Sequence, residues 1–415
     1  MQSFAERAGY YLGAFLVGVF LHSLWPQVPA PIVPITFGVA LLVLLYIQIK
    51  HPMSRFVCIC LLAALLGVWR FDLARPGLAA SVRPFDPNGF AYNRQITDTP
   101  IEKWMENHRL AISRRIHSVL PGDEGALLSG ILYGERSLSA EAKQAFKDAG
   151  LTHVVAVSGS NVMIVVLALG KVFSLLGFSR KRAFIYLSFS LVAFVLFVTP
   201  QAPVVRAAIM GWLMTLAPII GRLPSSGRLL LVSASVFVMW QPQALLFDPS
   251  FALSFLATAG LMTWGSWLDR LLEKRLPWDV FRETLSATFG ATLMTTPYTA
   301  WAFGQASIFG ILTNLAAVPL IPWIMGSGMV LMIFPHPILA LPAQGLLASL
   351  LWISRLPSIF GLVSIPVAVS PWFAVGCYIP MAYLWFRVSR NPQLASDNNS
   401  KTLDLTDSGL EKRLG

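Results

Sequence analysis

The chain has 415 residues, of which 55% are hydrophobic and 12% are charged. Soluble domains carry roughly 45–50% apolar and about 25% charged residues, so this composition excludes an ordinary soluble fold. The 27 Phe and 13 Trp residues also exclude a disordered chain, because disordered segments have few aromatic residues and much charge. The sequence therefore predicts an all-α integral membrane protein that crosses the membrane many times.

About twelve apolar stretches with few charges follow one another along the chain. Since a helix needs about 20 apolar residues to cross the hydrocarbon core, they predict a polytopic bundle of about 10–12 transmembrane helices. Prolines fall within or beside several stretches, which predicts broken or kinked helices. The stretches are 8–25, 32–49, 56–69, 151–170, 183–199, 204–220, 229–241, 249–267, 284–302, 306–334, 337–353 and 358–386.

The spacing of these stretches predicts four parts of the chain. Residues 1–70 form an N-terminal three-helix membrane segment, and residues 71–120 form a short extracytoplasmic segment. From about Pro100 onward, apolar residues recur three or four positions apart, which predicts an amphipathic helix on the outer surface. Residues 121–388 form the main membrane domain, and the polar residues 389–415 predict a disordered cytoplasmic tail.

Basic residues concentrate in every second loop, for example at 171–182, 222–228 and 270–282. Short cytoplasmic loops carry an excess of Lys and Arg. This pattern therefore predicts a multi-pass protein of the cytoplasmic membrane with both termini in the cytoplasm. The same excess accounts for most of the net charge of +11, so that charge does not by itself indicate a nucleic-acid-binding surface.

The histidine and cysteine patterns argue against the common catalytic centres. No H-x-H-x-D-H or H-E-x-x-H cluster occurs among the six histidines, and the three cysteines all lie in apolar runs. A G-x-x-x-x-G-K-[ST] phosphate loop is absent as well, so we do not expect the chain to hydrolyse nucleotides. We expect no enzyme activity, no catalytic residue, no metal and no cofactor, with energy for transport supplied by other proteins.

Strongly polar residues of the main membrane domain gather in four segments, at 150–161, 201–206, 248–254 and 303–307. With the orientation above, each segment begins a helix that runs from the outside to the inside. Four helix N-termini then meet at one level and present unpaired backbone N–H groups, a setting that favours anions such as phosphates. Polar groups in a membrane are costly unless they face the bundle interior, so these residues are candidates for a transport pathway.

The first polar segment presents a single polar face if it is helical throughout. At 100° per residue, His153 and Ser160 lie about 20° apart, and Asn161 and Ser158 follow on the same side. Gly159 either lets another backbone approach closely or breaks the helix there. The alternative is a helix interface of small residues with one hydrogen-bonded histidine.

Arg206 follows Pro203 in the first turns of its predicted helix, which is the unfavourable end for a cation. It therefore needs a partner: a carboxylate such as Asp248, a carbonyl group or a passing phosphate. An ion pair and a ligand contact both stay open. Asp248 directly precedes Pro249, which is typical of a helix N-cap.

Several segments resemble those of the ComEC family of competence proteins, polytopic channels implicated in DNA uptake. The most characteristic is GLTHVVAVSG at 150–159, preceded by LLSGILYGER at 127–136. Similar segments follow in the family's order: VRAAIM at 205–210, DPSFALSFLA at 248–257 and TNLAAVPL at 313–320. The resemblance covers about residues 120–385. Asn161 stands where many members have a histidine.

The resemblance implies a channel for the inward translocation of single-stranded DNA across the cytoplasmic membrane during natural transformation. Residues 121–388 are then the competence-type channel domain. The OB-type domain and the metallo-β-lactamase-like domain that many members carry are not expected in this chain. Besides single-stranded DNA and membrane lipid, the implied partners are a separate DNA receptor, a nuclease and a cytoplasmic ATPase motor.

Two other functions stay open, namely a small-anion or lipid-headgroup transporter and a non-transporting scaffold of the uptake machinery. The residues expected to line the pathway are the polar and small residues of the four segments and one further asparagine. Among them, His153, Ser158, Asn161 and Arg206 rank first. The full set is His153, Ser158, Gly159, Asn161, Arg206, Asp248, Ser254, Gln305 and Asn314.

Overall fold

The structure is a computed structural model that describes residues 4–24, 38–39, 41–43, 45–46, 52–74, 100–135, 137–155, 157–198, 202–221, 226–306, 309–361, 365–367 and 369–389. These residues form an all-α fold with a single two-residue strand pair, as the composition predicts. Most of the predicted middle helix at 32–49 and nearly all of the predicted tail at 389–415 lie outside the described residues.

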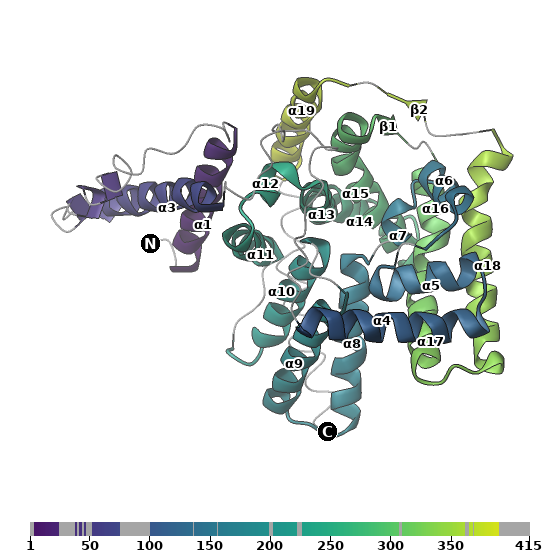
Figure 1. Cartoon of the computed structure of the whole chain (residues 1–415). Helices are drawn as coiled ribbons and strands as arrows, with labels where there is room; N and C mark the ends of the chain where they lie inside the picture. The colour runs from purple at the N-terminus through teal and green to yellow at the C-terminus, as the bar shows by residue number, and fades with distance from the viewer. Residues whose placement is uncertain are drawn as a thin grey trace.

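Helices follow one another along the described chain (Figure 1). The N-terminal part contains α1 (Phe4–Ser23), α3 (Pro52–Ala74) and α4 (Pro100–Val119). The membrane domain contains α5 (Asp123–Tyr133), α6 (Ala140–Asp148), α7 (Thr152–Val155), α8 (Gly159–Leu175), α9 (Arg180–Val198), α10 (Ala202–Leu216), α11 (Ser226–Trp240), α12 (Ala244–Phe247), α13 (Pro249–Gly260), η2 (Leu261–Gly265), α14 (Ser266–Leu272), α15 (Asp279–Phe303), α16 (Gly310–Ala317), η3 (Val318–Leu320), α17 (Ile321–Ile333), α18 (Pro337–Ile359) and α19 (Pro371–Ser389). The antiparallel strands β1 (Gln305–Ala306) and β2 (Ile365–Pro366) join the ends of α15 and α18.

Five helical stretches are long and apolar enough to cross a membrane: Pro52–Ala74, Arg180–Val198, Pro249–Leu272, Gly310–Ile333 and Pro337–Ile359. Three shorter apolar helices, Gly159–Leu175, Pro203–Leu216 and Ser226–Trp240, accompany them. These helices confirm a polytopic helical membrane fold. The described residues give fewer full-length apolar spans than the apolar stretches suggest, because three stretches fold as shorter helices and most of the stretch at 32–49 lies outside the described residues.

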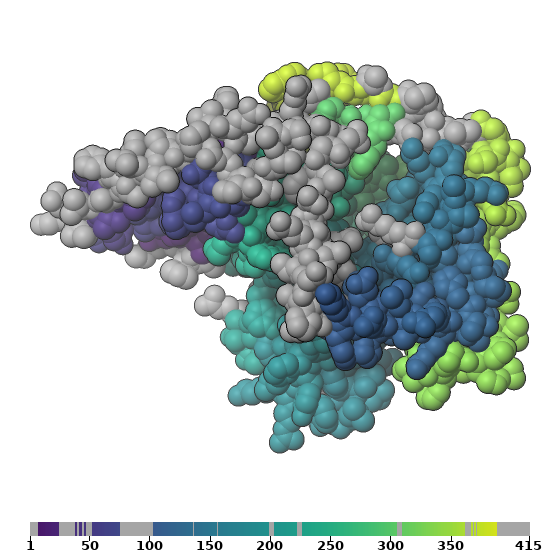
Figure 2. All heavy atoms as spheres, viewed as in Figure 1, coloured from purple at the N-terminus to yellow at the C-terminus, as the bar shows by residue number. Residues whose placement is uncertain are grey.

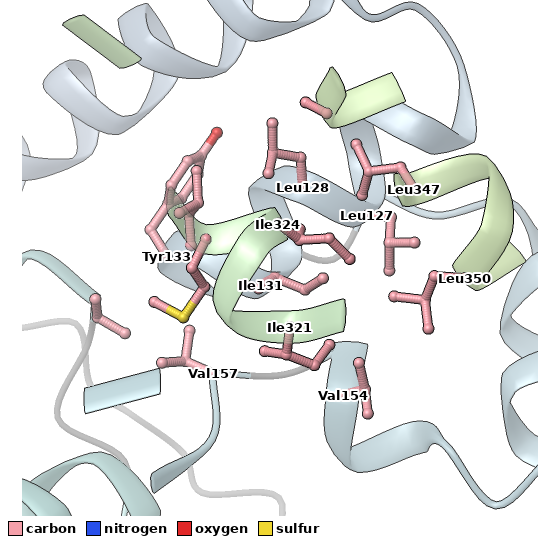
Figure 3. Packing of buried hydrophobic residues seen from close by; sticks show 14 of the residues in the cluster. Leu127, Leu128, Ile131, Tyr133, Val154, Val157, Ile321, Ile324, Leu347 and Leu350 are labelled. Carbon is pink, nitrogen blue, oxygen red and sulfur yellow. The ribbon is translucent and has the colours of Figure 1, made fainter. Parts of the chain in front are cut away.

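The main hydrophobic core surrounds α5, whose residues from Gly125 to Tyr133 are all buried. In Figure 1, α4 and α5 run across α17 and α18 rather than along them. Figure 3 shows how the α5 side chains Leu127, Leu128 and Ile131 meet residues of α17 and α18. Gly134 ends α5 with a φ of 84°, a conformation that glycine adopts without steric cost. The α5 core thus holds the short helices α5 and α7 in fixed positions within the bundle.

The predicted helix from Pro100 is confirmed as α4, which packs Ile112 and Ile116 onto the α5 core. At the other end of the bundle, α1 and α3 cross closely and share a second core with α11, α12 and α13. Arg70 of α3 donates from Nε to the Met239 carbonyl at 2.7 Å and from Nη2 to the Trp240 carbonyl at 2.8 Å. It thereby satisfies backbone carbonyls at the end of α11 and attaches α3 to the membrane domain.

Some of the prolines that are predicted to break or kink helices lie at breaks, and others do not. Pro319 lies in the 3₁₀ segment η3 between α16 and α17, whereas Pro297 lies inside the continuous helix α15. A π-helical turn, η2, separates α13 from α14. There Gly290 of α15 packs so closely that a Cβ atom on it would lie 2.5 Å from the Gly260 carbonyl oxygen. Interrupted helices of this kind are tolerated in a membrane where neighbouring helices cover them.

Candidate anion site at the start of α8

A break in the backbone separates α7 from α8. Ser158 has extended angles, with φ −95° and ψ 164°, and α8 begins only at Gly159. Of the alternatives that the sequence leaves open at Gly159, the structure shows the break, and His153 and Ser160 do not share one helical face. The reason is local, since the Ser158 side chain accepts a bond from the Asn161 backbone N–H at 3.4 Å and so caps a new helix. His153 lies exposed on α7.

Asn161 fastens the start of α8 to the α5 core. Its Nδ2 donates to the Ile131 carbonyl of α5 at 2.9 Å, and its Oδ1 accepts from the Ser158 hydroxyl at 2.8 Å. Only 2% of the residue is exposed. The Ser158 hydroxyl also lies 2.7 Å from that of Ser160. The side chains of this turn are thus bonded chiefly to each other and to α5.

Arg206 reaches the same turn from α10. Its Nε donates to the Ser254 hydroxyl of α13 at 2.6 Å, and its Nη1 lies 3.6 Å from the Met210 sulfur. A Cβ atom on Gly159 would lie 2.6 Å from Nη2, so the guanidinium rests directly against the first residue of α8. We call Ser158, Gly159, Ser160, Arg206 and Ser254 the Arg206 cluster.

The Arg206 cluster carries positive charge that described carboxylates do not neutralise. Among the described residues, no acidic side chain lies within 4.0 Å of the guanidinium. Arg206 also lies near the N-terminal ends of α8 and α10, where unpaired backbone N–H groups add positive partial charge. This arrangement disfavours the cation in isolation and favours a bound anion.

Asp248 has the capping role that its sequence predicts. Its Oδ1 accepts from the Ser250 backbone N–H at 2.8 Å, and Pro249 occupies the first position of α13. The alternative of an ion pair with Arg206 is not found among the described side chains. Ser254, one and a half turns further along α13, is the residue that contacts Arg206 instead.

The two remaining expected pathway residues lie outside the Arg206 cluster. Gln305 is in β1, where its backbone pairs with Pro366 of β2, and its side chain is outside the described residues. Asn314 is 8% exposed, and its Oδ1 has no hydrogen-bond partner within the described part of the chain. Its neighbour Thr313 donates to the Ala149 carbonyl at 2.6 Å, which attaches α16 to the segment before α7.

Two residues that contact the guanidinium, Met210 and Phe255, were absent from the predicted set. The Phe255 ring centre lies 5.7 Å from Cζ of Arg206, a cation–π distance. The spacing of Met210, four residues after Arg206, signals a contact on one helix face. Phe255 gives no such signal, because its contact depends on the packing of α10 against α13. Within the described residues, no group of three or more His, Cys, Asp or Glu side chains could hold a metal ion.

Comparison with known proteins places this site in a family. A family model described as "Competence protein" matches residues 131–391, more than half of the chain, and every residue of the Arg206 cluster lies inside that range. The chain belongs to the competence protein family. The match confirms the resemblance seen in the sequence at about 120–385. Helices α1, α3 and α4 lie before the matched region.

The chain also matches part of a longer curated protein. Over 261 residues the chain is 25% identical to ComE operon protein 3 of Bacillus subtilis (strain 168), a match that covers 60% of this chain and 33% of that protein. This competence-family chain therefore matches about a third of the length of its curated relative. No solved structure matches this chain.

Proposed function

We propose that this chain takes part in DNA uptake during natural transformation, as the membrane channel through which single-stranded DNA moves inward across the cytoplasmic membrane. The observation that carries the proposal is the position of the Arg206 cluster, an anion-favouring site inside an apolar bundle and inside the region that matches the competence family. Single-stranded DNA presents one negative charge per phosphate. A guanidinium can bind these groups in turn without regard to base sequence.

The proposed orientation has both termini in the cytoplasm. Three helical stretches, α16 to α17, α18 and α19, follow Gly304, and the predicted orientation requires an odd number there. The starts of α8, α10 and α13, which meet at the Arg206 cluster, would then belong to helices that run inward. Other proteins complete the proposed machinery. They supply a DNA receptor on the outside, a nuclease and an ATPase motor. We propose no enzyme activity for the chain itself.

Deletion of the gene in a naturally competent host tests the proposal. Uptake of fluorescently labelled DNA into a nuclease-protected internal pool should disappear in the deletion strain and return when the wild-type gene is supplied. Surface binding of DNA should persist, because the receptor is a separate protein. Normal internal uptake in the deletion strain would contradict the proposal.

A small-anion or lipid-headgroup transporter is the second candidate. The Arg206 cluster favours it because the cluster contains a single guanidinium, which can bind one anionic group whether that group belongs to DNA, a lipid or a free anion. A secondary transporter works alone, so the purified chain in liposomes would move phosphate when an ion gradient is applied. A DNA channel that depends on a separate cytoplasmic motor would not. A scaffold, the third class, would keep DNA uptake when Arg206 is replaced by alanine.

A further inference from the structure

Helix α4 presents an exposed side that is both aromatic and basic. At 100° per residue, Trp104, Arg115 and His108 lie within about 40° of one another, and Arg114 lies about 80° from Trp104 on its other side. All four residues are exposed, and we call them the Trp104 strip. The apolar side of α4, by contrast, packs onto the α5 core. The Trp104 strip is therefore the side of α4 that faces away from the protein.

The two arginines of the Trp104 strip carry charge that no described carboxylate neutralises. Nε of Arg114 donates to the Leu110 carbonyl of its own helix at 3.4 Å, a long bond that leaves the charge in place. Among the described residues, no acidic side chain lies within 4.0 Å of Arg114 or Arg115. Lys103 and Arg109 on the same helix have other contacts. The available charge of α4 thus comes from Arg114 and Arg115.

The exposed carboxylate of Glu106 lies away from these two arginines. Glu106 precedes Arg114 by eight residues, about 12 Å along the helix axis, and lies on the opposite side of the helix from Arg115. Exposed charges that are farther apart than the Debye length, about 8 Å at physiological salt, are largely screened from each other. The Trp104 strip is therefore positively charged at its Arg114 and Arg115 end.

Trp104 and His108 form a close aromatic pair one helical turn apart. Their ring centres are 3.9 Å apart, and Nδ1 of His108 lies 2.8 Å from the Trp104 carbonyl. The imidazole covers part of the indole, yet 56% of Trp104 stays exposed. An exposed ring that is already held in place suits stacking with a nucleic-acid base.

The Trp104 strip is connected to the Arg206 cluster through α5. Helix α4 packs against α5, and Asn161 at the start of α8 is bonded to the Ile131 carbonyl of α5. Figure 2 shows α4 on the surface of the molecule. In the proposed orientation, α4 belongs to the segment outside the membrane. A strand that arrives from the outside therefore meets α4 before it enters the bundle.

We infer that the Trp104 strip binds a single-stranded nucleic acid, with a base stacked on Trp104 and phosphates at Arg114 and Arg115. The inference rests on the proposed function and names a contact that precedes the Arg206 cluster. A helix that lies in a lipid surface turns its apolar side to the lipid, whereas α4 buries that side against α5. An exposed aromatic ring beside cations matches a polyanion that also carries bases.

The two kinds of contact have different signatures. Each phosphate contact on a single strand releases counterions, and the logarithm of the binding constant then falls with the logarithm of salt concentration by about 0.7 per contact. Stacking lowers the dissociation constant without a comparable release of counterions. Loss of the arginines should therefore change the salt slope, and loss of the tryptophan should change the affinity alone.

Titration of the full-length chain in nanodiscs of neutral lipid with fluorescent oligothymidine, at several salt concentrations, tests the inference. For R114Q/R115Q the salt slope should be less steep by about 1.4, from two contacts of about 0.7 each. The variant W104A should bind about tenfold more weakly with an unchanged slope, and W104F, which keeps a ring, should recover most of the affinity.

Matched controls separate the Trp104 strip from general effects of charge and surface. R180Q/R182Q removes two exposed arginines at the start of α9, and W323A removes an exposed tryptophan of α17. Both should bind as wild type. In addition, an oligonucleotide with 5-iododeoxyuridine should form its photo-crosslink on the peptide that contains Trp104.

An unchanged slope in R114Q/R115Q, wild-type affinity in W104A, or a wild-type chain that binds no oligothymidine would overturn the inference. Equal losses in the strip variants and their controls would overturn it as well, because they would show a diffuse effect. Displacement of the oligonucleotide by a short-chain anionic phospholipid would identify a lipid headgroup as the occupant instead. None of these outcomes bears on the gene deletion, so failure of the inference and failure of the proposed function are distinguishable.

Discussion

Asn161 and Arg206 both contribute polar groups to the first turn of α8, but they differ in where their hydrogen bonds go. Asn161 bonds to Ile131 and Ser158, two partners within the protein, and is almost completely buried. Arg206 has one good hydrogen bond, to Ser254, and weaker contacts with Met210 and Phe255. A guanidinium has five N–H donors, so most of the donors of Arg206 have no hydrogen-bond partner among the described side chains.

This difference indicates that Asn161 has a structural role and that Arg206 is suited to bind a ligand. Inside a membrane bundle every polar group needs a partner, and an asparagine that finds two within the protein serves packing. A cation with spare donors next to a helix N-terminus is better matched to an anion than to its protein surroundings. On this account a change at Asn161 alters how much protein folds, and a change around Arg206 alters what each folded molecule does.

Replacement of Asn161 by alanine should have the largest effect on folding. The change removes the donor to the Ile131 carbonyl and leaves a buried acceptor unpaired, which costs about 1–3 kcal/mol. We expect a clear fall in the amount of inserted protein and in its melting temperature in detergent. DNA uptake per inserted molecule should stay close to wild type. Ser174→Ala, a change at an exposed serine near the other end of α8, serves as the control.

Gly159→Ala should show the opposite behaviour. The new Cβ atom would lie 2.6 Å from Nη2 of Arg206, and the guanidinium is the far end of a flexible side chain that can move away. Insertion and melting temperature should therefore stay near wild type, because alanine also favours helix more than glycine does. Uptake should fall about tenfold, equivalent to about 1.4 kcal/mol. The account fails at this position if uptake is normal, or if loss of uptake merely follows loss of protein.

Ser254→Ala should have a smaller effect in the same direction. It removes the hydroxyl that holds Nε of Arg206 at 2.6 Å but leaves the charge in place. We expect uptake to fall a few-fold, since a hydrogen bond to a charged group contributes about 1.5–3 kcal/mol and a water molecule can replace part of it. Thr258→Ala, one turn further along α13, is a matched control because the Thr258 hydroxyl bonds only to its own helix.

Asp248→Asn should have the smallest effect. Asparagine caps helices as well as aspartate does, so the bond to the Ser250 N–H is retained and only the charge is lost. Protein level and uptake should both stay within about twofold of wild type, a free-energy change of less than 0.5 kcal/mol. A severe loss of insertion would show instead that the carboxylate has a charged partner.

The sequence predicts the class of fold because hydropathy fixes it directly. Apolar stretches, breaks at prolines such as Pro319, and the cap at Asp248 depend only on nearby residues, and the structure confirms them. Ser158 shows where such reasoning leaves alternatives open. A regular helix over 153–161 is consistent with the periodicity, but a serine that bonds to the backbone three residues ahead stabilises a new helix start instead.

The candidate site was only partly predictable for a related reason. Arg206, Ser158 and Gly159 stand out as polar or small residues in apolar surroundings. The sequence offered Asp248 as an available carboxylate partner for Arg206, whereas Ser254 is the residue that contacts it. That choice depends on the rotation of α13 against α10, which long-range packing sets and local sequence does not encode.

The measurement that tests the central claim most directly is DNA uptake by cells that carry Arg206→Gln, compared with Arg206→Lys at equal membrane levels of protein. Glutamine removes the charge, so uptake should fall about a hundredfold, equivalent to about 2.7 kcal/mol. Lysine keeps the charge without the bidentate geometry and should retain part of the uptake. Arg228→Gln, at an exposed arginine near the start of α11, should have no effect. Wild-type uptake in Arg206→Gln cells would contradict the claim that Arg206 contacts the moving strand.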